Sequence, residues 1–312
     1  MKRGGTCVRR GKTQKKVPAG RDGDKRTMFI YTEDDLDLDR IADSGQCFRW
    51  EKTGEQAYRI PAGGRCLRIS ARGGGRFALD CAEQEYDAFW KDYFDLGEDY
   101  RAIRARIDPE EDPFLFRAAE EEKGIRILRQ DPWETLVTFI ISQNKNIPAI
   151  RRSVAYLAAM AGETRTDAEG VPYQVFPGPE AVAALSGDEL KRCSLGYRCA
   201  YVRGAAEAVL NGSLDLAALC RMGEEEALGA LTGLYGVGIK VASCTALFGL
   251  HHMDAFPKDV WIRRILEAEY PGGYPEEKYR PYNGVYQQYM FAYYRKEAAG
   301  GAAAEASCSP VT

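Results

Sequence analysis

An amine and a carboxylate stand 19 residues apart beside a glycine turn, and together they could act on a sugar carbon. Lys240 follows Gly236-Val237-Gly238, and Asp259 follows a second turn further along the chain. At the positive start of a helix the ammonium form of a lysine is disfavoured, which makes its amine a better nucleophile. Such an amine can displace a leaving group and form an imine, while a carboxylate stabilises the developing positive charge.

The glycine turn could hold the substrate through a phosphate. Because glycine allows positive φ, a tight hairpin can connect the helices that we expect at residues 224–231 and 241–250. N–H groups at a helix start bind anions, and nucleic-acid phosphate is an abundant anion. Each feature alone has an ordinary alternative: a loop that needs glycines, a solvated surface lysine, and a helix N-cap at Asp259. Their combination favours sugar chemistry on a nucleic acid.

The rest of the chain must position this hairpin, and its pattern changes once. Short apolar segments separated mostly by glycine turns predict an antiparallel sheet, with strands at 28–31, 47–50, 57–60, 66–69 and 76–79. From residue 85 the periodicity is helical, with a loop at 164–178. We therefore predict an α+β fold with four parts: a disordered basic tail (1–26), a sheet domain with flanking helices (27–112), a helical domain (113–297) and a disordered tail (298–312).

Composition and charge fit a globular protein in which any nucleic-acid binding must rest on local positive features. The chain has 312 residues, 45% hydrophobic and 29% charged, which suits about two domains. Residues 1–26 carry ten Lys or Arg against two Asp, or +8, and the other 33 basic and 44 acidic residues give −11. The basic arm either binds polyanions loosely or is a solvated tail. An acidic body argues against a broad electrostatic groove for nucleic acid.

Targeting signals and metal motifs are not evident in the sequence. No run of ~18 apolar residues predicts a membrane span. The N-terminus lacks the apolar core of a secretory signal, so we expect a cytoplasmic protein, nucleoid-associated if bacterial. Nine cysteines are dispersed without a CxxC pair, which predicts neither a zinc site nor a disulfide framework.

Several motifs, in one order, resemble the 8-oxoguanine DNA glycosylase family of the helix-hairpin-helix superfamily. The main match is Leu234-Tyr-Gly-Val-Gly-Ile-Lys240 followed by Asp259. Others, within residues 35–296, are Ser44-Gly-Gln-Cys-Phe-Arg-Trp50, Tyr93-Phe-Asp-Leu96, Ile127-Leu-Arg-Gln-Asp-Pro132, Phe139-Ile-Ile-Ser-Gln-Asn-Lys-Asn-Ile147, Leu195-Gly-Tyr-Arg198 and Gly284-Val-Tyr-Gln-Gln-Tyr-Met-Phe291.

The resemblance implies a helix-hairpin-helix glycosylase domain and a bifunctional DNA glycosylase and abasic-site lyase. It would act as a monomer on double-stranded DNA containing 8-oxoguanine, without a membrane. No cofactor is implied. Relatives with an iron–sulfur cluster use four closely spaced cysteines after the catalytic domain, whereas only Cys308 lies beyond Cys244 here.

The resemblance also assigns roles to individual residues. Lys240 is the Schiff-base nucleophile and Asp259 the catalytic carboxylate. In the base pocket, the Gly45 carbonyl accepts the N7–H that only the oxidised guanine carries. Gln287 reads the Watson–Crick edge, and the base lies between two further side chains, Cys244 and Phe291.

DNA contacts are implied for a second group of residues. Asn144 fills the space that the extruded base leaves, Tyr197 wedges into the duplex, and Arg198 contacts the unpaired partner base. Gly236 and Gly238 form the phosphate-binding hairpin. Without the resemblance, these polar and glycine residues could equally be a helix cap and loops.

Three positions depart from the family pattern. Ala149 stands where members strict for cytosine opposite the lesion carry a second arginine, and Arg151 lies on a different helical face, so we expect weak discrimination of the opposite base. Trp261 stands where many relatives have a phosphate-contacting histidine, and Tyr235 replaces a hairpin proline.

Two alternatives remain open from the sequence. An alkylated-base glycosylase of the same superfamily usually lacks the hairpin lysine. A non-catalytic helix-hairpin-helix DNA-binding protein has no reason to keep Lys240, Asp259 and Gln287 together. Covalent trapping on an 8-oxoguanine duplex distinguishes the lyase from both.

Overall fold

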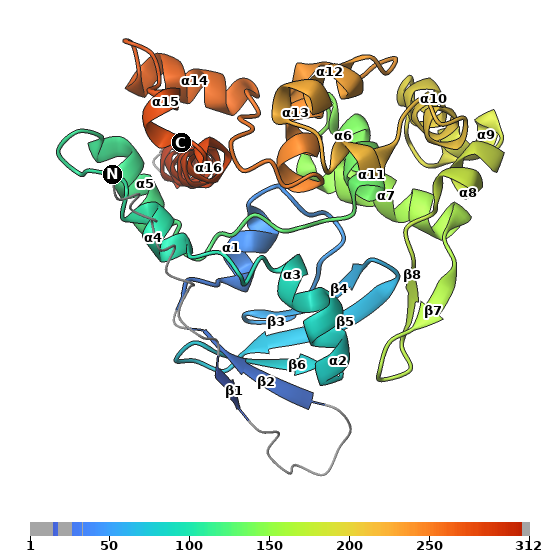
Figure 1. The fold of residues 1–312 in the computed structure, drawn as a ribbon, viewed down its shortest axis with the longest axis horizontal. Helices are drawn as coiled ribbons and strands as arrows, with labels where there is room; N and C mark the ends of the chain where they lie inside the picture. The colour runs from blue at the N-terminus through green and yellow to red at the C-terminus, as the bar shows by residue number, and fades with distance from the viewer. Residues whose placement is uncertain (1–14, 18–26, 33, 308–312) are drawn as a thin grey trace, which may run out of the picture.

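An antiparallel sheet forms one end of the molecule and helices form the other (Figure 1). The computed structural model describes residues 15–17, 27–32 and 34–307. Of the tails predicted at 1–26 and 298–312, residues 1–14, 18–26 and 308–312 lie outside the described part of the chain. Within the described ranges, no helix has both the length and the apolar character needed to cross a bilayer.

The sheet has six strands, and every neighbouring pair is antiparallel. In the strand Arg65–Ala71 (β5) the side chains of Leu67 and Ile69 are buried while those of Cys66, Arg68 and Ser70 are partly exposed, which is the alternation expected when one face is packed. In sheet order the strands are β1 (Lys15–Val17), β2 (Thr27–Tyr31), β6 (Arg76–Asp80), β5 (Arg65–Ala71), β4 (Ala57–Ala62) and β3 (Glu51–Gly54).

The helices nearest the sheet are short, and a π-helical segment interrupts one of them. They are α1 (Leu38–Asp43), α2 (Glu83–Glu85), η1 (Tyr86–Trp90), α3 (Lys91–Tyr93) and α4 (Tyr100–Arg104). The helical part contains α5 (Pro113–Glu121), α6 (Pro132–Ser142), α7 (Ile147–Ala161), α8 (Pro179–Ala184), α9 (Gly187–Arg192), α10 (Arg198–Leu210), α11 (Leu216–Leu219), α12 (Glu224–Thr232), α13 (Ile239–Phe248), α14 (Val260–Glu269), α15 (Glu276–Tyr279) and α16 (Asn283–Ser307).

The predicted α+β architecture, a small antiparallel sheet followed by a mostly helical part, is confirmed. The strand predicted at 47–50 is wrong, because these residues form an irregular segment before β3. Its apolar side chains are buried in two different cores: Phe48 packs among the helices, whereas Cys47 and Trp50 pack with the sheet. Tertiary packing therefore outweighs local strand propensity here.

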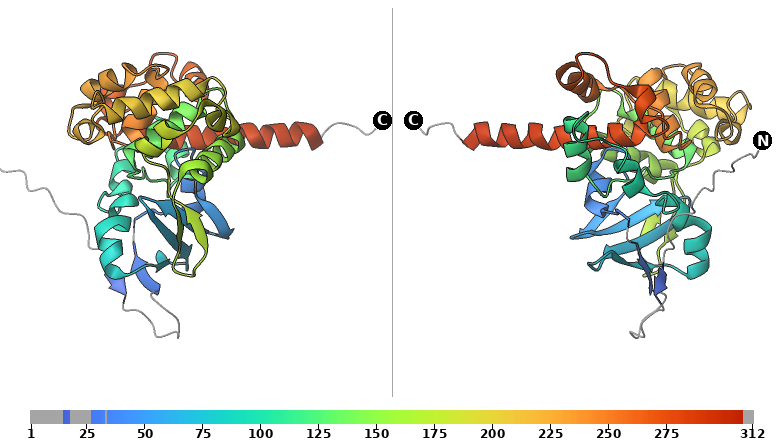
Figure 2. Two further views of the ribbon diagram at one scale, coloured as in Figure 1. Left: turned by 90° about the vertical axis from the view of Figure 1, so that its right-hand side faces the viewer. Right: turned by 60° about the vertical axis from the view of Figure 1, so that its left-hand side comes forward.

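The structure departs from the predicted loop and tails in three places. Residues 164–178 contain a two-stranded hairpin, β7 (Thr164–Thr166) and β8 (Pro172–Gln174). β1 lies inside the predicted tail at 1–26 and pairs with β2. Helix α16 continues past residue 297 to Ser307, and Figure 2 shows its last turns extending beyond the body. The pattern of small residues in this segment is compatible with a helix as well as with a tail.

Two hydrophobic cores meet at a buried carboxylate. Asp95 accepts hydrogen bonds from the Arg129 Nε (2.8 Å) and the Tyr100 hydroxyl (2.9 Å), and its Oδ2 lies 3.3 Å from His251 Nε2. Burial alone raises the pKa of Asp95, but His251, Arg129 and Tyr100 together hold it below its usual value. His251 belongs to the loop between α13 and α14, so this carboxylate ties that loop to the sheet side of the molecule. The chain division at residue 112 stays a prediction, since α4 contributes Tyr100 to the helical core.

Replacing this carboxylate is expected to destabilise the fold in a pH-dependent way. Asp95→Asn removes a buried carboxylate whose Arg129 partner is half exposed, so we expect a loss of about 1.5–3 kcal/mol, the usual contribution of a hydrogen bond to a charged group. Because the folded pKa lies below the unfolded one, the stabilisation is present above about pH 4 and is lost as the pH falls further. Urea unfolding of wild type and variant should therefore differ most at neutral pH and converge in acid. A difference in unfolding free energy that stays constant into acid would contradict this assignment.

Candidate active site

The glycine hairpin between α12 and α13 has the geometry that its sequence predicts. Gly236 has φ +80°, and a Cβ there would lie 2.2 Å from the ring of Tyr201. Only glycine fits this position without moving the tyrosine. Gly238 is the N-cap of α13, and a Cβ there would meet nothing within 4 Å. The start of α13 is thus open on the side where a phosphate can approach its N–H groups.

The two glycines should therefore respond differently to substitution by alanine. Gly236→Ala adds backbone strain and a collision with Tyr201, and we expect it to lower the free energy of unfolding by about 2 kcal/mol or more. Gly238→Ala should stay within about 1 kcal/mol of wild type but weaken DNA binding, because a methyl group approaches the anion site. Chemical unfolding and fluorescence anisotropy measure the two effects. Equal destabilisation by both variants would contradict these roles.

Lys240 is the second residue of α13, and its amine faces helix α6. The Nζ lies 3.5 Å from the Ser142 hydroxyl and 5.2 Å from the centroid of the Phe139 ring. Among the ion pairs of the described residues, none involves Lys240. The amine is therefore held near α6 by a weak hydrogen bond and a cation–π contact, and it stays available for reaction.

Asp259 and Cys244 lie at the same site as Lys240. Asp259 is the N-cap of α14, where its Oδ1 accepts the Ile262 N–H at 2.9 Å. Cys244 follows Lys240 by one turn of α13 and is buried. Burial raises the pKa of the Cys244 thiol to about 11, while the charge of Lys240 lowers it and that of Asp259 raises it. The thiol is thus within electrostatic reach of both the amine and the carboxylate.

Three residues predicted for the base pocket lie on two elements that meet. Gly45, in the loop after α1, has φ +80°, and a Cβ there would lie 3.2 Å from the Phe291 ring on α16. Gln287 is one turn before Phe291 and is buried. Its Nε2 donates to the Pro257 carbonyl at 3.1 Å, two residues before Asp259. The α16 residues therefore connect the Gly45 loop to the Asp259 segment.

A buried glutamine holds the Gly45 loop in place. The Gln46 Nε2 donates to the Ser44 hydroxyl (2.8 Å) and to the Arg126 carbonyl (2.9 Å), and its Oε1 accepts the Leu128 N–H (2.9 Å). The neighbouring Gly45 carbonyl accepts no hydrogen bond from the residues that the structure describes. A fixed loop with a free carbonyl is suited to accepting a hydrogen bond from a ligand.

The residues predicted to contact DNA gather beside the hairpin. The Asn144 Nδ2 donates to the Tyr197 hydroxyl at 3.0 Å, and the Tyr197 side chain is 52% exposed. The Gln143 Nε2 donates to the Gly236 carbonyl at 3.1 Å, which ties the Asn144 loop to the hairpin. Tyr235 is 74% exposed, so aromatic side chains as well as polar ones are presented on this surface.

Arg198 does not lie open at this surface. Its side chain is buried, and its guanidinium donates to the carbonyls of Gln143 and Leu195. The guanidinium carbon is 4.3 Å from the Tyr197 ring centroid. In this conformation Arg198 supports the tyrosine, so a contact with a partner base would require it to turn outward.

Sequence reasoning missed three side chains at the site. Tyr201 packs against Gly236, Ser142 binds the Lys240 amine, and Arg295 lies against Phe291. Each acts through a contact between distant segments, which helical periodicity does not reveal. For Tyr201 there was a usable signal, since the resemblance places Tyr197 one turn earlier on the same side of the chain.

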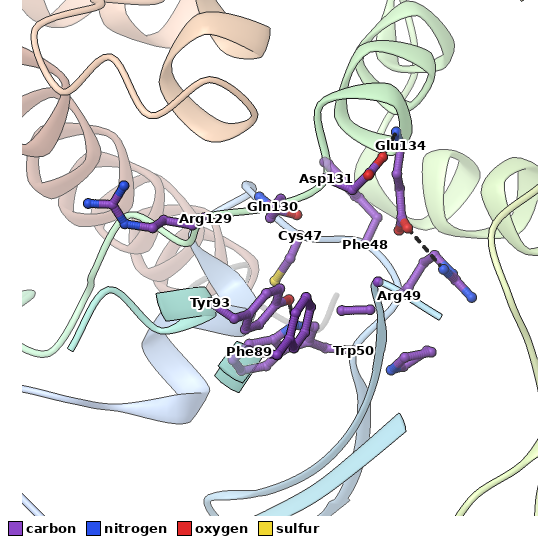
Figure 3. Close-up of a pocket in the computed structure, with 13 residues that line it drawn as sticks. Cys47, Phe48, Arg49, Trp50, Phe89, Tyr93, Arg129, Gln130, Asp131 and Glu134 are labelled. Carbon is purple, nitrogen blue, oxygen red and sulfur yellow. Dashed lines mark hydrogen bonds and ion pairs between the residues drawn. The ribbon is translucent and has the colours of Figure 1, made fainter. Parts of the chain in front are cut away.

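Two cavities lie near these residues, and only one contains the amine. A cavity of about 360 Å³ is lined by Lys240, Ser243 and Lys258 among others. Another, of about 190 Å³, is lined by Cys47, Phe89 and Glu134 among others (Figure 3). This second cavity contains neither Lys240 nor Asp259, so it is not the pocket in which the reaction takes place. The Arg49–Glu134 ion pair (3.1 Å) at its edge ties the segment before β3 to α6. In the described part of the chain, no cluster of three or more His, Cys, Asp or Glu side chains could hold a metal ion.

Comparisons with known proteins identify the family of the chain. Residues 28–136 match the family described as 8-oxoguanine DNA glycosylase, N-terminal domain. The N-glycosylase/DNA lyase OGG1 of Arabidopsis thaliana is 31% identical over 242 residues, covering 75% of this chain and 66% of that protein. The chain spans 66% or less of the length of the curated relatives it matches.

Two solved structures share most of the architecture. MBOgg1, in complex with a low-affinity DNA ligand, is 33% identical with a TM-score of 0.85, over 92% of this chain and 100% of that one. The Clostridium acetobutylicum 8-oxoguanine glycosylase/lyase, in complex with double-stranded DNA containing cytosine opposite 8-oxoG, is 28% identical with a TM-score of 0.82. That match covers 92% of this chain and 99% of the other. From motif order, fold and identity together, the chain belongs to the 8-oxoguanine DNA glycosylase family.

Proposed function

We propose that this protein is a bifunctional DNA glycosylase and abasic-site lyase that removes 8-oxoguanine from double-stranded DNA. The observation that carries the proposal is the meeting of two pairs of residues at one site. Lys240 lies one helical turn before the buried Cys244 on α13. Asp259 begins α14 two residues after the carbonyl that binds Gln287, and Phe291, one turn after Gln287 on α16, faces the Gly45 loop. The protein acts as a monomer in this proposal, because every residue it uses lies on one chain.

Base release is a substitution at the sugar. The neutral amine of Lys240 attacks C1′ of the lesion nucleotide, the C1′–N9 bond breaks, and the base leaves with the bonding electrons and takes up a proton. Positive charge develops on the sugar as that bond lengthens, and the Asp259 carboxylate stabilises it. The attached nitrogen loses a proton, and its lone pair then forms the C=N bond as the C1′–O4′ bond breaks and O4′ takes up a proton, which gives a protonated imine between Lys240 and C1′.

Strand cleavage follows from the imine. The protonated imine withdraws electrons from C2′, so a proton leaves C2′ and the electrons form the C1′–C2′ enamine. The C1′–C2′ electrons of the enamine then form a C2′–C3′ double bond and the imine is restored, while the bond between C3′ and its phosphate oxygen breaks and the phosphate leaves with the electrons of that bond. Hydrolysis of the imine returns the free Lys240 amine. One lysine therefore serves both the glycosylase and the lyase reaction.

Lesion recognition rests on one hydrogen bond. The oxidised base carries a hydrogen at N7, which can donate to the free Gly45 carbonyl. Guanine has a lone pair at N7, so two acceptors would face each other and the buried carbonyl would stay unpaired, at a cost of about 1–3 kcal/mol. Phe291 supplies a stacking surface beside that carbonyl, and Gln287 supplies amide groups for the Watson–Crick edge.

The direct test compares lesions in otherwise identical duplexes. The protein should release 8-oxoguanine and cleave the strand, and it should leave duplexes with 3-methyladenine or undamaged guanine intact. Release of the alkylated base without strand cleavage would favour the alkylated-base glycosylase. Binding without release of any base would favour a non-catalytic DNA-binding protein.

The base opposite the lesion is expected to matter little. Ala149 presents no side chain that can hydrogen-bond to a partner base, Arg151 is bound to the Ala42 carbonyl, and Arg198 is buried. Excision rates measured opposite each of the four bases should therefore vary by less than about tenfold, less than one charged hydrogen bond usually contributes. A strong preference for cytosine would contradict this prediction and indicate that Arg198 turns outward on DNA.

A further inference from the structure

Arg295 touches the proposed base pocket from two directions. It lies one turn after Phe291 on α16, and its guanidinium carbon is 5.2 Å from the centroid of the Phe291 ring. Its Nη1 donates to the Asp43 carbonyl at 3.0 Å, at the end of α1. The same Nη1 would lie 4.0 Å from a Cβ at Gly45. The guanidinium therefore sits where the Gly45 loop and the Phe291 ring meet.

This guanidinium has hydrogen-bonding capacity to spare. Of its five N–H donors, one is used within the residues that the structure describes. Burial lowers the pKa of Arg295, whereas the charges of Asp43 and Asp259 raise it, and a guanidinium stays charged in proteins. A partly desolvated cation with free donors gains from an acceptor that a ligand brings into the pocket.

The oxidised base supplies such an acceptor at this edge. Its O8 is bonded to C8, the atom next to N7, so a base whose N7–H donates to Gly45 presents O8 to the same side. Guanine has only a C–H at C8. Its N7 lone pair could attract the arginine, but that lone pair would still face the Gly45 carbonyl.

We propose that Arg295 is a further specificity-determining residue that donates a hydrogen bond to O8 of the flipped base. The inference rests on the proposed function and adds a second point of discrimination to it. Gly45 reads the hydrogen that oxidation adds at N7, and Arg295 reads the oxygen that it adds at C8. Both groups are positioned by the end of α1, through the Gly45 loop and the Asp43 carbonyl.

The chain offers a matched control in Arg151. On α7, its Nη2 donates to the Ala42 carbonyl at 3.1 Å, one residue before the carbonyl that Arg295 binds. Within the described residues, Arg151 makes no cation–π contact with Phe291. Removing it takes away an equal charge and a similar brace on α1, without removing the donor beside the ring.

The test measures binding without turnover, in a Lys240→Gln parent. Dissociation constants are compared for duplexes that carry 8-oxoguanine or guanine opposite cytosine. Arg295→Met, which keeps the aliphatic stem over Phe291, should lower the preference for 8-oxoguanine by about tenfold or more, the contribution of one charged hydrogen bond. Arg295→Lys should restore part of the preference, and Arg151→Met should leave it unchanged. Arg295→Gln provides the same comparison if the methionine variant does not fold.

Three results separate the outcomes. Equal weakening of both duplexes by Arg295→Met would show a phosphate contact and overturn the inference. An unchanged preference would overturn it as well. If the Lys240→Gln parent itself binds both duplexes equally, the proposed function fails rather than the role of Arg295.

Discussion

Lys240→Gln is expected to lower the rate of 8-oxoguanine release by about 10³-fold or more, in the range seen when an enzyme loses its nucleophile. It should also abolish strand cleavage. Glutamine has similar length and can still lie against Ser142 and Phe139, but its amide cannot form an imine. Single-turnover assays that follow free base and cleaved strand separately measure both effects.

The matched control is Lys258→Gln, the same change in a neighbouring amine. Lys258 lines the same cavity as Lys240 and forms an exposed ion pair with Glu276 at 2.9 Å. Loss of its charge should change DNA affinity slightly and leave strand cleavage intact. If Lys258→Gln abolished cleavage, or Lys240→Gln retained it, the nucleophile would be misassigned.

Asp259→Asn is expected to slow base release by about 10²- to 10³-fold, the usual effect of removing one group that stabilises transition-state charge. Asparagine caps a helix as well as aspartate does, so α14 should keep its start and the protein its stability. The variant retains Lys240 and should still form an imine on a pre-made abasic site, where no base has to leave.

This contrast between substrates makes the prediction for Asp259 specific. Single-turnover release from an 8-oxoguanine duplex gives the first rate, and strand cleavage at an abasic duplex gives the second. Chemical unfolding shows whether the helix cap is preserved. A variant with a wild-type rate of base release, or one that loses stability in proportion to its activity, would contradict a role in charge stabilisation.

The fold class could be predicted because its signals are local. Glycine turns separate the strands at 57–60, 66–69 and 76–79, and proline begins α5 and α6 after an aspartate cap, as helix-start chemistry predicts. The strand prediction at 47–50 was wrong because the apolar residues of this segment are buried in two different cores, and an apolar sequence pattern does not show which core each residue enters. The hairpin at 164–174 was missed because its stability comes from Arg59 and Arg68 on the sheet, which bind Asp167.

The site was predictable where one residue type is demanded by chemistry or by space. Lys240 and Asp259 can be proposed from their residue types and their positions at helix starts, and the glycine at position 236 is required by the ring of Tyr201. Residues that act through contacts with distant segments cannot be recognised from their type or local position. Ser142 is 98 residues from Lys240, and the carbonyl that Arg295 binds is 252 residues away. Only the fold brings these partners together.

The central claim is that the Lys240 amine forms a covalent imine with the sugar of an excised 8-oxoguanine nucleotide. Borohydride reduces such an imine to a stable amine, so incubation with an 8-oxoguanine duplex and borohydride should leave wild-type protein joined to the DNA. Proteolysis and mass spectrometry should locate the adduct on Lys240. Absence of any adduct, or an adduct on another lysine such as Lys258, would contradict the claim.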